Sequence, residues 1–192
     1  MKKLCVLASM MMLSLGVFAQ HEVGTLTLQP KVGLNIANMS EYDNSDPRLG
    51  FSVGGEFEYQ ATPIISLSAG MLYSQQGLKY DLANTTNTIK ADYINIPVLA
   101  NFYVVKGLAL KVGVQPGFNV SSKIKIDNGN TSLSRDIDNT NSFDFAIPVG
   151  LSYEYESIVI DGRYNIGMTK AFDGGDAKHN VFQITLGYKF AL

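Results

Sequence analysis

Cysteine, tryptophan and histidine are scarce in this chain of 192 residues, and neither sign of charge dominates. The single cysteine, Cys5, excludes a disulfide framework and a thiolate metal site, and two histidines, His21 and His179, leave little material for histidine chemistry. Fifteen Lys and Arg residues nearly balance 17 Asp and Glu residues, so the basic surface of a nucleic-acid-binding protein is missing. These absences disfavour most enzyme classes, and the length suits one domain.

The first 20 residues have the organisation of a secretory signal peptide. Two lysines after the initial Met precede an apolar run, which ends in the small-residue exit Val17-Phe18-Ala19. The run is shorter than the ~20 residues that a membrane-spanning helix needs. We predict a cleaved signal peptide at residues 1–19 and a mature domain at residues 20–192, and the alternative is a buried core helix.

Apolar and polar side chains alternate with a period of two residues from Leu26 onward, which is typical of β-strands with two different faces. The alternation recurs in eight segments, at residues 26–36, 51–59, 65–74, 94–102, 108–119, 143–155, 158–166 and 182–190. Segments of this length suit a transmembrane barrel, in which a tilted strand needs about 9 to 11 residues.

The connections between the segments alternate in length. Short connections fall at residues 61–63, 105–107 and 156–157, and long ones at residues 38–48, 77–92, 121–142 and 169–180. In outer-membrane barrels the short turns face the periplasm and the long loops face the outside. The sequence therefore predicts an all-β fold, an eight-stranded antiparallel up-and-down transmembrane β-barrel in the outer membrane, with both termini in the periplasm.

Aromatic residues of the apolar face gather at two heights. Phe51, Tyr73, Phe118, Phe143, Phe145 and Phe182 fall near the long loops, and Phe57, Tyr59, Phe102, Tyr153, Tyr155, Tyr188 and Phe190 near the short turns. Two aromatic girdles around an aliphatic band are expected of a surface in contact with outer-membrane lipid. The alternative is a soluble barrel with the apolar face inside, which would leave Lys31 and Arg163 outside and would not account for the girdles.

Five short blocks resemble the PorT-like outer-membrane β-barrel family of Gram-negative bacteria. They are Lys31-Val32-Gly33-Leu34-Asn35, Tyr73-Ser74-Gln75-Gln76-Gly77, Tyr93-Ile94-Asn95-Ile96-Pro97-Val98, Asp161-Gly162-Arg163-Tyr164-Asn165-Ile166-Gly167 and Leu186-Gly187-Tyr188-Lys189-Phe190. The resemblance implies a small outer-membrane barrel, and some members of the family are accessory to protein secretion. The chain ends on Leu192 instead of an aromatic residue, but Tyr188, Phe190 and Leu192 share one face that the outer-membrane insertion machinery could recognise.

Eight charged residues fall on the inward-facing side of the predicted strands. They are Lys31, Glu56, Glu58, Lys111, Glu154, Asp161, Arg163 and Lys189. The interior of an eight-stranded barrel is just wide enough for side chains, and an unpaired buried charge would cost several kcal/mol. We therefore predict an ion-pair network that fills the lumen, with a path for protons or small ions as the alternative.

Pairing across neighbouring strands gives this network a specific arrangement. It predicts Lys31 opposite Glu56, Lys111 near Glu154, and Asp161 between Arg163 and Lys189.

No catalytic residue, cofactor or metal site is predicted. Acidic clusters at residues 127–130, 136–139 and 173–176 could ligate calcium, but none completes a twelve-residue calcium loop. A lipid hydrolase of the outer membrane would need Ser, His and an acid at the outer rim, where His179 is the one candidate histidine, and no G-x-S-x-G motif is present.

The sequence predicts an integral outer-membrane protein with a filled lumen and a structural or surface-interaction role. Its expected partners are outer-membrane lipid, the insertion machinery and other envelope or secretion proteins, and no nucleic acid. The main alternative is an accessory role in protein secretion across the outer membrane. A narrow channel and a lipid-modifying enzyme are further alternatives.

Overall fold

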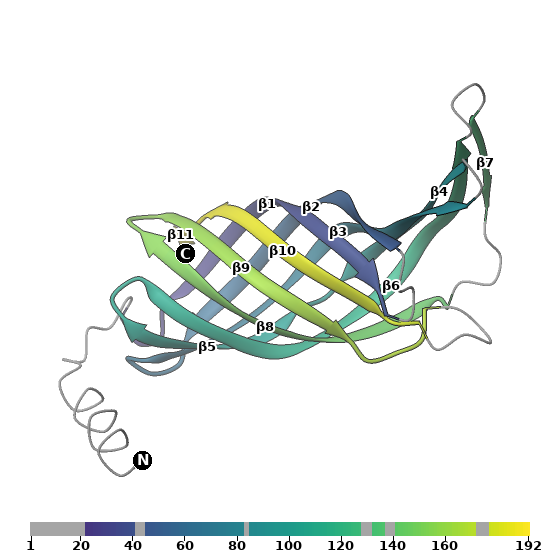
Figure 1. Ribbon diagram of the computed structural model, residues 1–192. Helices are drawn as coiled ribbons and strands as arrows, with labels where there is room; N and C mark the ends of the chain where they lie inside the picture. Colours follow the sequence, from purple (N-terminus) through teal and green to yellow (C-terminus); the bar gives the residue numbers. More distant parts are fainter. Residues whose placement is uncertain (1–21, 41–44, 83–84, 128–131, 137–140, 172–176) are drawn as a thin grey trace, which may run out of the picture.

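The computed structural model describes residues 22–40, 45–82, 85–127, 132–136, 141–171 and 177–192. Figure 1 shows a closed barrel of tilted strands, from which a smaller sheet projects at one end. The predicted signal peptide, residues 1–19, lies outside the described residues. In the described part of the chain, no helix has the length and apolar character needed to cross a membrane.

The barrel wall is a ring of antiparallel strands that follow one another in chain order. The strands are β1 (Leu26–Met39), β2 (Ser45–Gln60), β3 (Ile65–Leu82), β4 (Thr85–Asn95), β5 (Val98–Val105), β6 (Leu108–Asp127), β7 (Ser132–Asp136), β8 (Phe143–Tyr155), β9 (Ile158–Gly167), β10 (His179–Tyr188) and β11 (Phe190–Ala191).

Eight wall positions result, because β7 pairs with β6 outside the ring, β4 and β5 together pair with β3 and β6, and β10 and β11 both pair with β1. The interruption between β4 and β5 falls at Ile96-Pro97, where proline cannot donate a ladder hydrogen bond. The pairing of β1 with β10 closes the ring. The prediction of an eight-stranded up-and-down barrel is confirmed.

The outer face of the wall is apolar and the inner face is polar. On β9, Ile158, Ile160 and Tyr164 are 45–54% exposed, while Asp161 and Arg163 between them are at most 1% exposed. This is the inside-out arrangement that a bilayer requires, because lipid and not water surrounds the wall. The alternative of a soluble barrel with an apolar interior is therefore wrong.

Two of the predicted long loops, residues 77–92 and 121–142, are wrong in part, because strand pairing continues into them. The β3–β4 ladder runs from Leu72 opposite Asn95 to Leu82 opposite Thr85. The β4–β6 and β6–β7 ladders extend in the same way. We call residues 77–82, 85–92, 121–127 and 132–136 the projecting sheet, which extends beyond the rest of the barrel in Figure 1.

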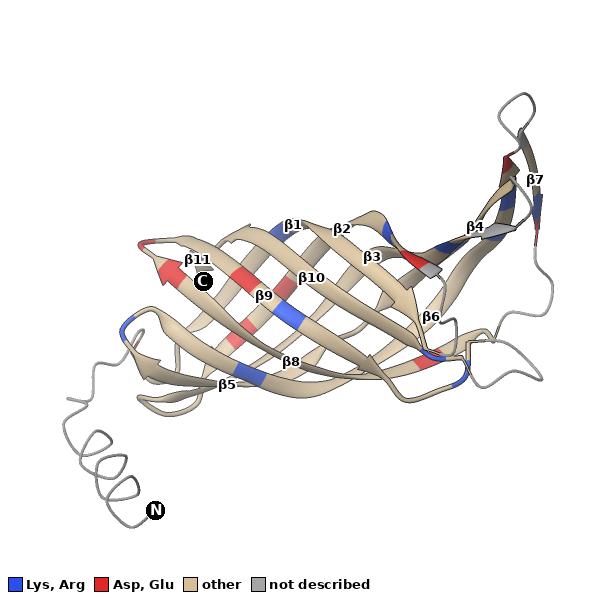
Figure 2. Cartoon of the chain, in the orientation of Figure 1, with Lys and Arg blue, Asp and Glu red and all other residues tan. Residues whose placement is uncertain are grey.

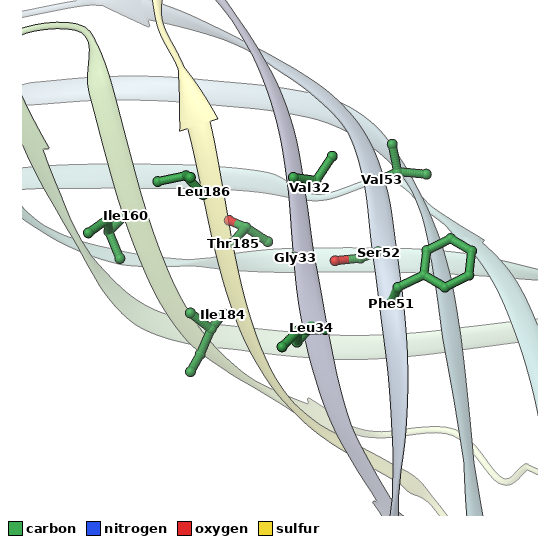
Figure 3. Close-up of a pocket in the computed structure, with 10 residues that line it drawn as sticks. All are labelled: Val32, Gly33, Leu34, Phe51, Ser52, Val53, Ile160, Ile184, Thr185 and Leu186. Atoms are coloured by element: carbon green, nitrogen blue, oxygen red, sulfur yellow. The ribbon is translucent and has the colours of Figure 1, made fainter.

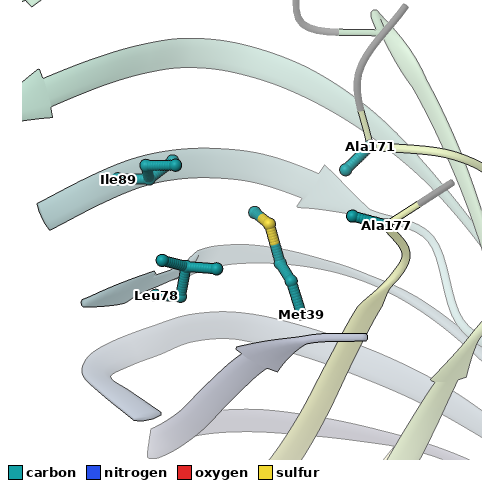
Figure 4. Packing of buried hydrophobic residues seen from close by; sticks show 5 residues of the cluster. All are labelled: Met39, Leu78, Ile89, Ala171 and Ala177. Carbon is teal, nitrogen blue, oxygen red and sulfur yellow. The ribbon is translucent and has the colours of Figure 1, made fainter. Parts of the chain in front are cut away.

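A small apolar core lies at the same end of the barrel. Met39, Leu78, Ile89, Ala171 and Ala177 are all buried there and pack together, with Tyr80 against them (Figure 4). They come from the end of β1, from the projecting sheet and from the connection between β9 and β10. We call this group the outer apolar cluster, and we call the two ends of the barrel the loop end and the turn end after their connections.

Candidate functional site

All eight charged residues predicted to face the lumen are buried inside the barrel. None of their side chains is more than 6% exposed. In Figure 2 the coloured charged positions of the barrel wall gather toward the turn end, on several different strands. They form two clusters.

The first cluster is centred on Arg163. Its guanidinium donates from Nε to Asp161 Oδ1 at 2.8 Å and from Nη2 to Asp161 Oδ2 at 2.7 Å. Arg163 Nη1 also donates to Glu56 Oε1 at 2.9 Å. Because Glu56 lies on β2 and Arg163 on β9, with β10 and β1 between them in the wall, this bond crosses the lumen. We call Lys31, Glu56, Lys111, Asp161 and Arg163 the Arg163 cluster.

Two lysines complete the Arg163 cluster. Lys31 Nζ lies 2.8 Å from Glu56 Oε2 and 3.8 Å from Asp161 Oδ2. Lys111 Nζ lies 2.8 Å from Asp161 Oδ2. Three cationic side chains therefore share two carboxylates, which leaves the cluster with one excess positive charge.

The second cluster is centred on Lys189, nearer the turn end. Lys189 Nζ lies 2.7 Å from Glu154 Oε2 and 3.1 Å from Glu58 Oε2. Glu58 also accepts hydrogen bonds from Tyr103 Oη and from Ser66 Oγ, the latter at 2.6 Å. One ammonium and two carboxylates leave this Lys189 cluster with one excess negative charge, which offsets the excess of the Arg163 cluster.

Two of the predicted contacts are present and two are wrong. Lys31 contacts Glu56, although the register places Lys31 opposite Gly54, and Asp161 contacts Arg163. Lys111 contacts Asp161 and not Glu154, and Lys189 contacts Glu58 and Glu154 and not Asp161. The reason is the stagger of tilted strands in a closed barrel, which brings together side chains that are not directly opposite one another in the ladder.

Close pairing of opposite charges compensates for the free energy lost when these eight charged side chains are buried. Each ion taken out of water loses several kcal/mol of hydration, and only close opposite charges and further hydrogen bonds compensate for that loss. The bidentate contact between Arg163 and Asp161 supplies the strongest geometry of this kind. The two clusters therefore hold strands β1, β2, β6, β8, β9 and the chain after β10 in one relative arrangement.

Sequence reasoning missed several polar contacts toward the loop end. The Tyr93 hydroxyl and His179 Nε2 are 3.2 Å apart, and the two rings meet edge to face. His179 is 2% exposed, so it packs inside the barrel and is not displayed at the rim. Thr169 Oγ1 donates to Asp144 Oδ1 at 2.6 Å. The sequence feature that could have indicated the inward position of Tyr93 is its place on the polar side of the alternating segment.

Metal ligation is not supported by the part of the chain that the structure describes. Within it, no three His, Cys, Asp or Glu side chains are grouped so as to hold an ion. Of the predicted acidic clusters, Asp127 pairs with Lys125 and Asp136 with Lys123. Residues 128–130, 137–139 and 173–176 lie outside the described residues.

The lipid-facing wall has an apolar depression between β9, β10, β1 and β2. It is lined by Val32, Gly33, Leu34, Phe51, Ser52, Val53, Ile160, Ile184, Thr185 and Leu186 (Figure 3). The large apolar side chains form its sides, and Gly33 lies between Val32 and Leu34. The depression belongs to the surface that lipid acyl chains contact.

Comparisons with known proteins agree with this architecture. The model of the outer membrane protein beta-barrel domain family matches residues 18–173. No curated protein matches the chain. Among solved structures, Ail, the attachment invasion locus protein of Yersinia pestis, in complex with the heparin analogue sucrose octasulfate, is similar at 17% identity and a TM-score of 0.52, over 88% of this chain and 99% of that one.

The outer membrane protein OprG of Pseudomonas aeruginosa is similar at 12% identity and a TM-score of 0.50, over 90% of this chain and 98% of OprG. At such identities the likeness concerns the fold. The family match covers most of the chain, and the wall exposes an apolar surface to lipid. The chain therefore belongs to the outer membrane protein beta-barrel domain family and is a small barrel of the outer membrane.

Proposed function

We propose that this protein is a non-conducting component of the outer membrane, with a structural or surface-interaction role. The observation that carries the proposal is the projecting sheet, which extends three wall strands beyond the lipid-facing band and adds β7. A barrel that serves only as a membrane anchor has no need of such an extension. The buried ion pairs support the other half of the proposal, because they occupy the lumen with side chains.

The outward face of the projecting sheet is rich in lysine. Lys79, Lys90, Lys123 and Lys125 share it, because the register places Lys90 opposite Lys123 and Lys79 and Lys125 both opposite Thr88. Lys123 and Lys125 have partners in Asp136 at 3.8 Å and Asp127 at 3.0 Å, and these pairs are exposed to water. Asp92, Asp127 and Asp136 lie on the same face, so it presents charges of both signs, and its lysines are the groups that would contact anionic groups at the cell surface.

Binding to a sulfated polysaccharide tests the surface role. Heparin is the first probe, because a heparin analogue is bound to the structurally similar Ail and because four lysines share one face here. We expect the refolded protein in nanodiscs to bind heparin, and a variant with all four lysines changed to Gln to lose that binding. Lys106→Gln, near the turn end, is the matched control and should change nothing. Binding that survives the fourfold change would contradict a role for this face.

Planar-bilayer recordings test the closed lumen. We expect the refolded wild-type protein to show no steady conductance in ordinary salt, because eight strands leave room for side chains and not for a water column. A stable open level in the wild type would establish a channel and overturn this half of the proposal.

The orientation in the membrane is part of the proposal. We expect cleavage after Ala19, a mature chain that starts at Gln20, the projecting sheet outside and both termini in the periplasm. Ser134→Cys, on the projecting sheet, should react with a membrane-impermeant maleimide on intact cells, and Lys106→Cys should not. The face formed by Tyr188, Phe190 and Leu192, all at least 47% exposed, is available to the insertion machinery.

An accessory role in protein secretion is the alternative, and the resemblance of five sequence blocks to the PorT-like family favours it. Purification from gently solubilised envelopes separates the two roles. A secretion accessory should recover secretion proteins in fixed ratio, and a variant whose residues 123–136 are replaced by a short turn should lose them. A surface component should recover no such set.

A further inference from the structure

An uncharged contact crosses the lumen at the loop end, between Tyr93 of β4 and His179 of β10. Around the ring, β1, β2 and β3 lie between these two strands on one side, and β6, β8 and β9 on the other. The Tyr93 hydroxyl nevertheless lies 3.2 Å from His179 Nε2. Both side chains are at most 2% exposed, so the wall encloses the contact. We call it the His179 bridge.

The His179 bridge borders the outer apolar cluster. Met39 of the cluster lies opposite His179 in the β1–β10 ladder, and Ala177 precedes His179 by two residues. On the β9 side the backbones are in close contact, because a side chain at Gly167 would collide with the His179 carbonyl oxygen. A change in the charge of His179 would therefore act directly on the packing of the cluster.

A second contact holds the connection between β9 and β10 to the wall. Thr169 Oγ1 donates to Asp144 Oδ1 of β8 at 2.6 Å and accepts from the Phe145 amide at 2.8 Å. Further along the same connection, the Ala171 amide donates to the Ala177 carbonyl at 2.8 Å, and both alanines belong to the outer apolar cluster. The bond between Thr169 and Asp144 therefore anchors one side of the cluster.

The surroundings of His179 leave one ring nitrogen unsatisfied. Among the described residues, His179 Nδ1 has no hydrogen-bond partner. Asp144 of β8 is the carboxylate that acts on the ring, and Tyr93 of β4 is the other titratable group against it. The residues of β1 and β9 that pack against it do not titrate. Arg48 of β2 is bound to a backbone carbonyl of β3 and lies 4.0 Å from a carboxylate of β4, and Lys178 alternates to the outward side.

Protonation of His179 would change what these contacts require. An imidazolium carries a proton on both ring nitrogens, so Nδ1 would need an acceptor that it now lacks. A buried charge without a partner is strongly unfavourable. Asp144 could serve as the partner only by leaving Thr169, and otherwise the ring must reach water. Either change releases the connection between β9 and β10.

We propose that His179 is a pH switch, whose protonation releases the connection between β9 and β10 and opens the outer apolar cluster. Burial disfavours the charged ring, so the closed state is the stable one at neutral pH. It loses stability as the pH falls below about 6.5, where a histidine in water becomes charged. Arg163 and Glu56 still cross the lumen, so the switch changes the loop end without opening a pore and goes beyond the proposed function.

Solvent exposure of the cluster at two pH values tests the switch. A neutral gadolinium chelate, added to the protein in nanodiscs, relaxes the methyl signals that water reaches. We expect this relaxation at Met39 and Ile89 to rise at least about threefold from about pH 7.5 to about pH 5, because the cluster opens locally. The methyl groups of Ile160, on the lipid side, are the control and should not change. Equal relaxation of Met39 and Ile89 at both pH values would overturn the proposal. An equal rise at Ile160 would also overturn it, since the whole barrel would then open.

Two variants separate the proton acceptor from the anchor. His179→Gln cannot become charged, so the difference between the two pH values should disappear, and His179→Phe replaces it if it does not fold. A difference that persists without His179 would assign the effect to a carboxylate and overturn the proposal. Thr169→Val removes the anchor, so its relaxation at about pH 7.5 should already approach that of the wild type at about pH 5. Wild-type relaxation of Thr169→Val at about pH 7.5 would contradict the anchoring role.

Discussion

The barrel wall and the projecting sheet share strands but reverse their polarity. On β3, Leu67 and Met71 point outward and are more than half exposed, while Ser66 and Ser68 point inward and are buried. Further along the same strand, Leu78 is the buried inward residue and Lys79 the exposed outward one. The inward and outward sides alternate without a break, so what changes is the solvent outside: lipid around the wall and water around the projecting sheet.

Strand β4 shows the same exchange of polar and apolar sides as β3, and the two strands together indicate where the membrane boundary falls. On β4, Ile89 is buried in the outer apolar cluster, and Lys90 next to it points outward, opposite Lys123 of β6. The last outward aromatic residue of β3 before this region is Tyr73, which packs against Phe51. We therefore expect the membrane boundary between Tyr73 and Lys79 on β3, where the aromatic girdle ends.

The largest effect should come from breaking the charged interior. Arg163→Met leaves Glu56 and Asp161 with only lysine partners, and removal of one member of a buried ion pair costs about 3 to 5 kcal/mol. Denaturant unfolding of the refolded protein in lipid vesicles measures the loss. Arg163→Lys keeps the charge but not the bidentate geometry and should cost less. An unchanged free energy of unfolding for Arg163→Met would show that the network contributes nothing to stability.

A charge placed in the lipid-facing wall should have the next largest effect. Val149→Arg puts a guanidinium near the middle of the bilayer and should cost about 2 to 4 kcal/mol. Ser134→Arg, the same charge on the projecting sheet, should be nearly neutral because it stays in water. Equal costs for the two variants, measured by the same unfolding assay, would place the membrane boundary elsewhere.

Loss of packing in the outer apolar cluster should cost less than the charge in lipid. Ile89→Ala removes three carbons from a buried side chain, and we expect about 2 kcal/mol, the low end for such changes, because the cluster is small. Ile160→Ala, on the lipid side, should cost less than Ile89→Ala, since lipid fills the space. The reverse order would mean that the cluster is not a packed core.

The smallest effect should come from the exposed ion pairs of the projecting sheet. Lys123 and Asp136 are 3.8 Å apart, with side chains 51% and 77% exposed. Exposed pairs contribute about 0 to 1 kcal/mol, so Lys123→Ala should change the unfolding free energy by no more than that. High salt should remove any difference in unfolding free energy between Lys123→Ala and the wild type. A loss as large as that of Arg163→Met would remove the distinction between the two regions.

The barrel wall was predictable because the alternation of apolar and polar residues along its strands indicates the same two sides, lipid and lumen, on each strand. Residues 158–166 were expected as a strand, and β9 spans Ile158–Gly167, since apolar and polar residues alternate through most of it, with Val159 as an apolar residue on the inward side. The inward side of Lys31, Glu56 and Arg163 followed from the same alternation. The ion-pair partners did not follow from the alternation. They depend on the stagger of the closed barrel, which cannot be read from a single hairpin.

The projecting sheet was missed for a different reason. After Gly77 the outward residues become polar, so a search for an apolar outward face ends there. Gly77 has φ 131°, in the region that favours glycine, and on sequence grounds it marks a loop. Strand pairing nevertheless continues from Leu78 to Leu82. The partner strand there contains the β-branched residues Thr85, Thr86, Thr88 and Ile89, which favour strands.

The bond between Glu56 and Arg163 has a consequence for assembly. The two residues are 107 positions apart in the chain and lie on opposite sides of the seam where β1 meets β10. They cannot meet until the last strand has arrived and the sheet has curled into a ring, and contacts between such distant residues form late. Until then, Glu56 and Arg163 remain apart on the concave side of an open sheet. The electrostatic stabilisation across the lumen therefore arrives only with ring closure, and a barrel that lacks its final strand gains none of that part.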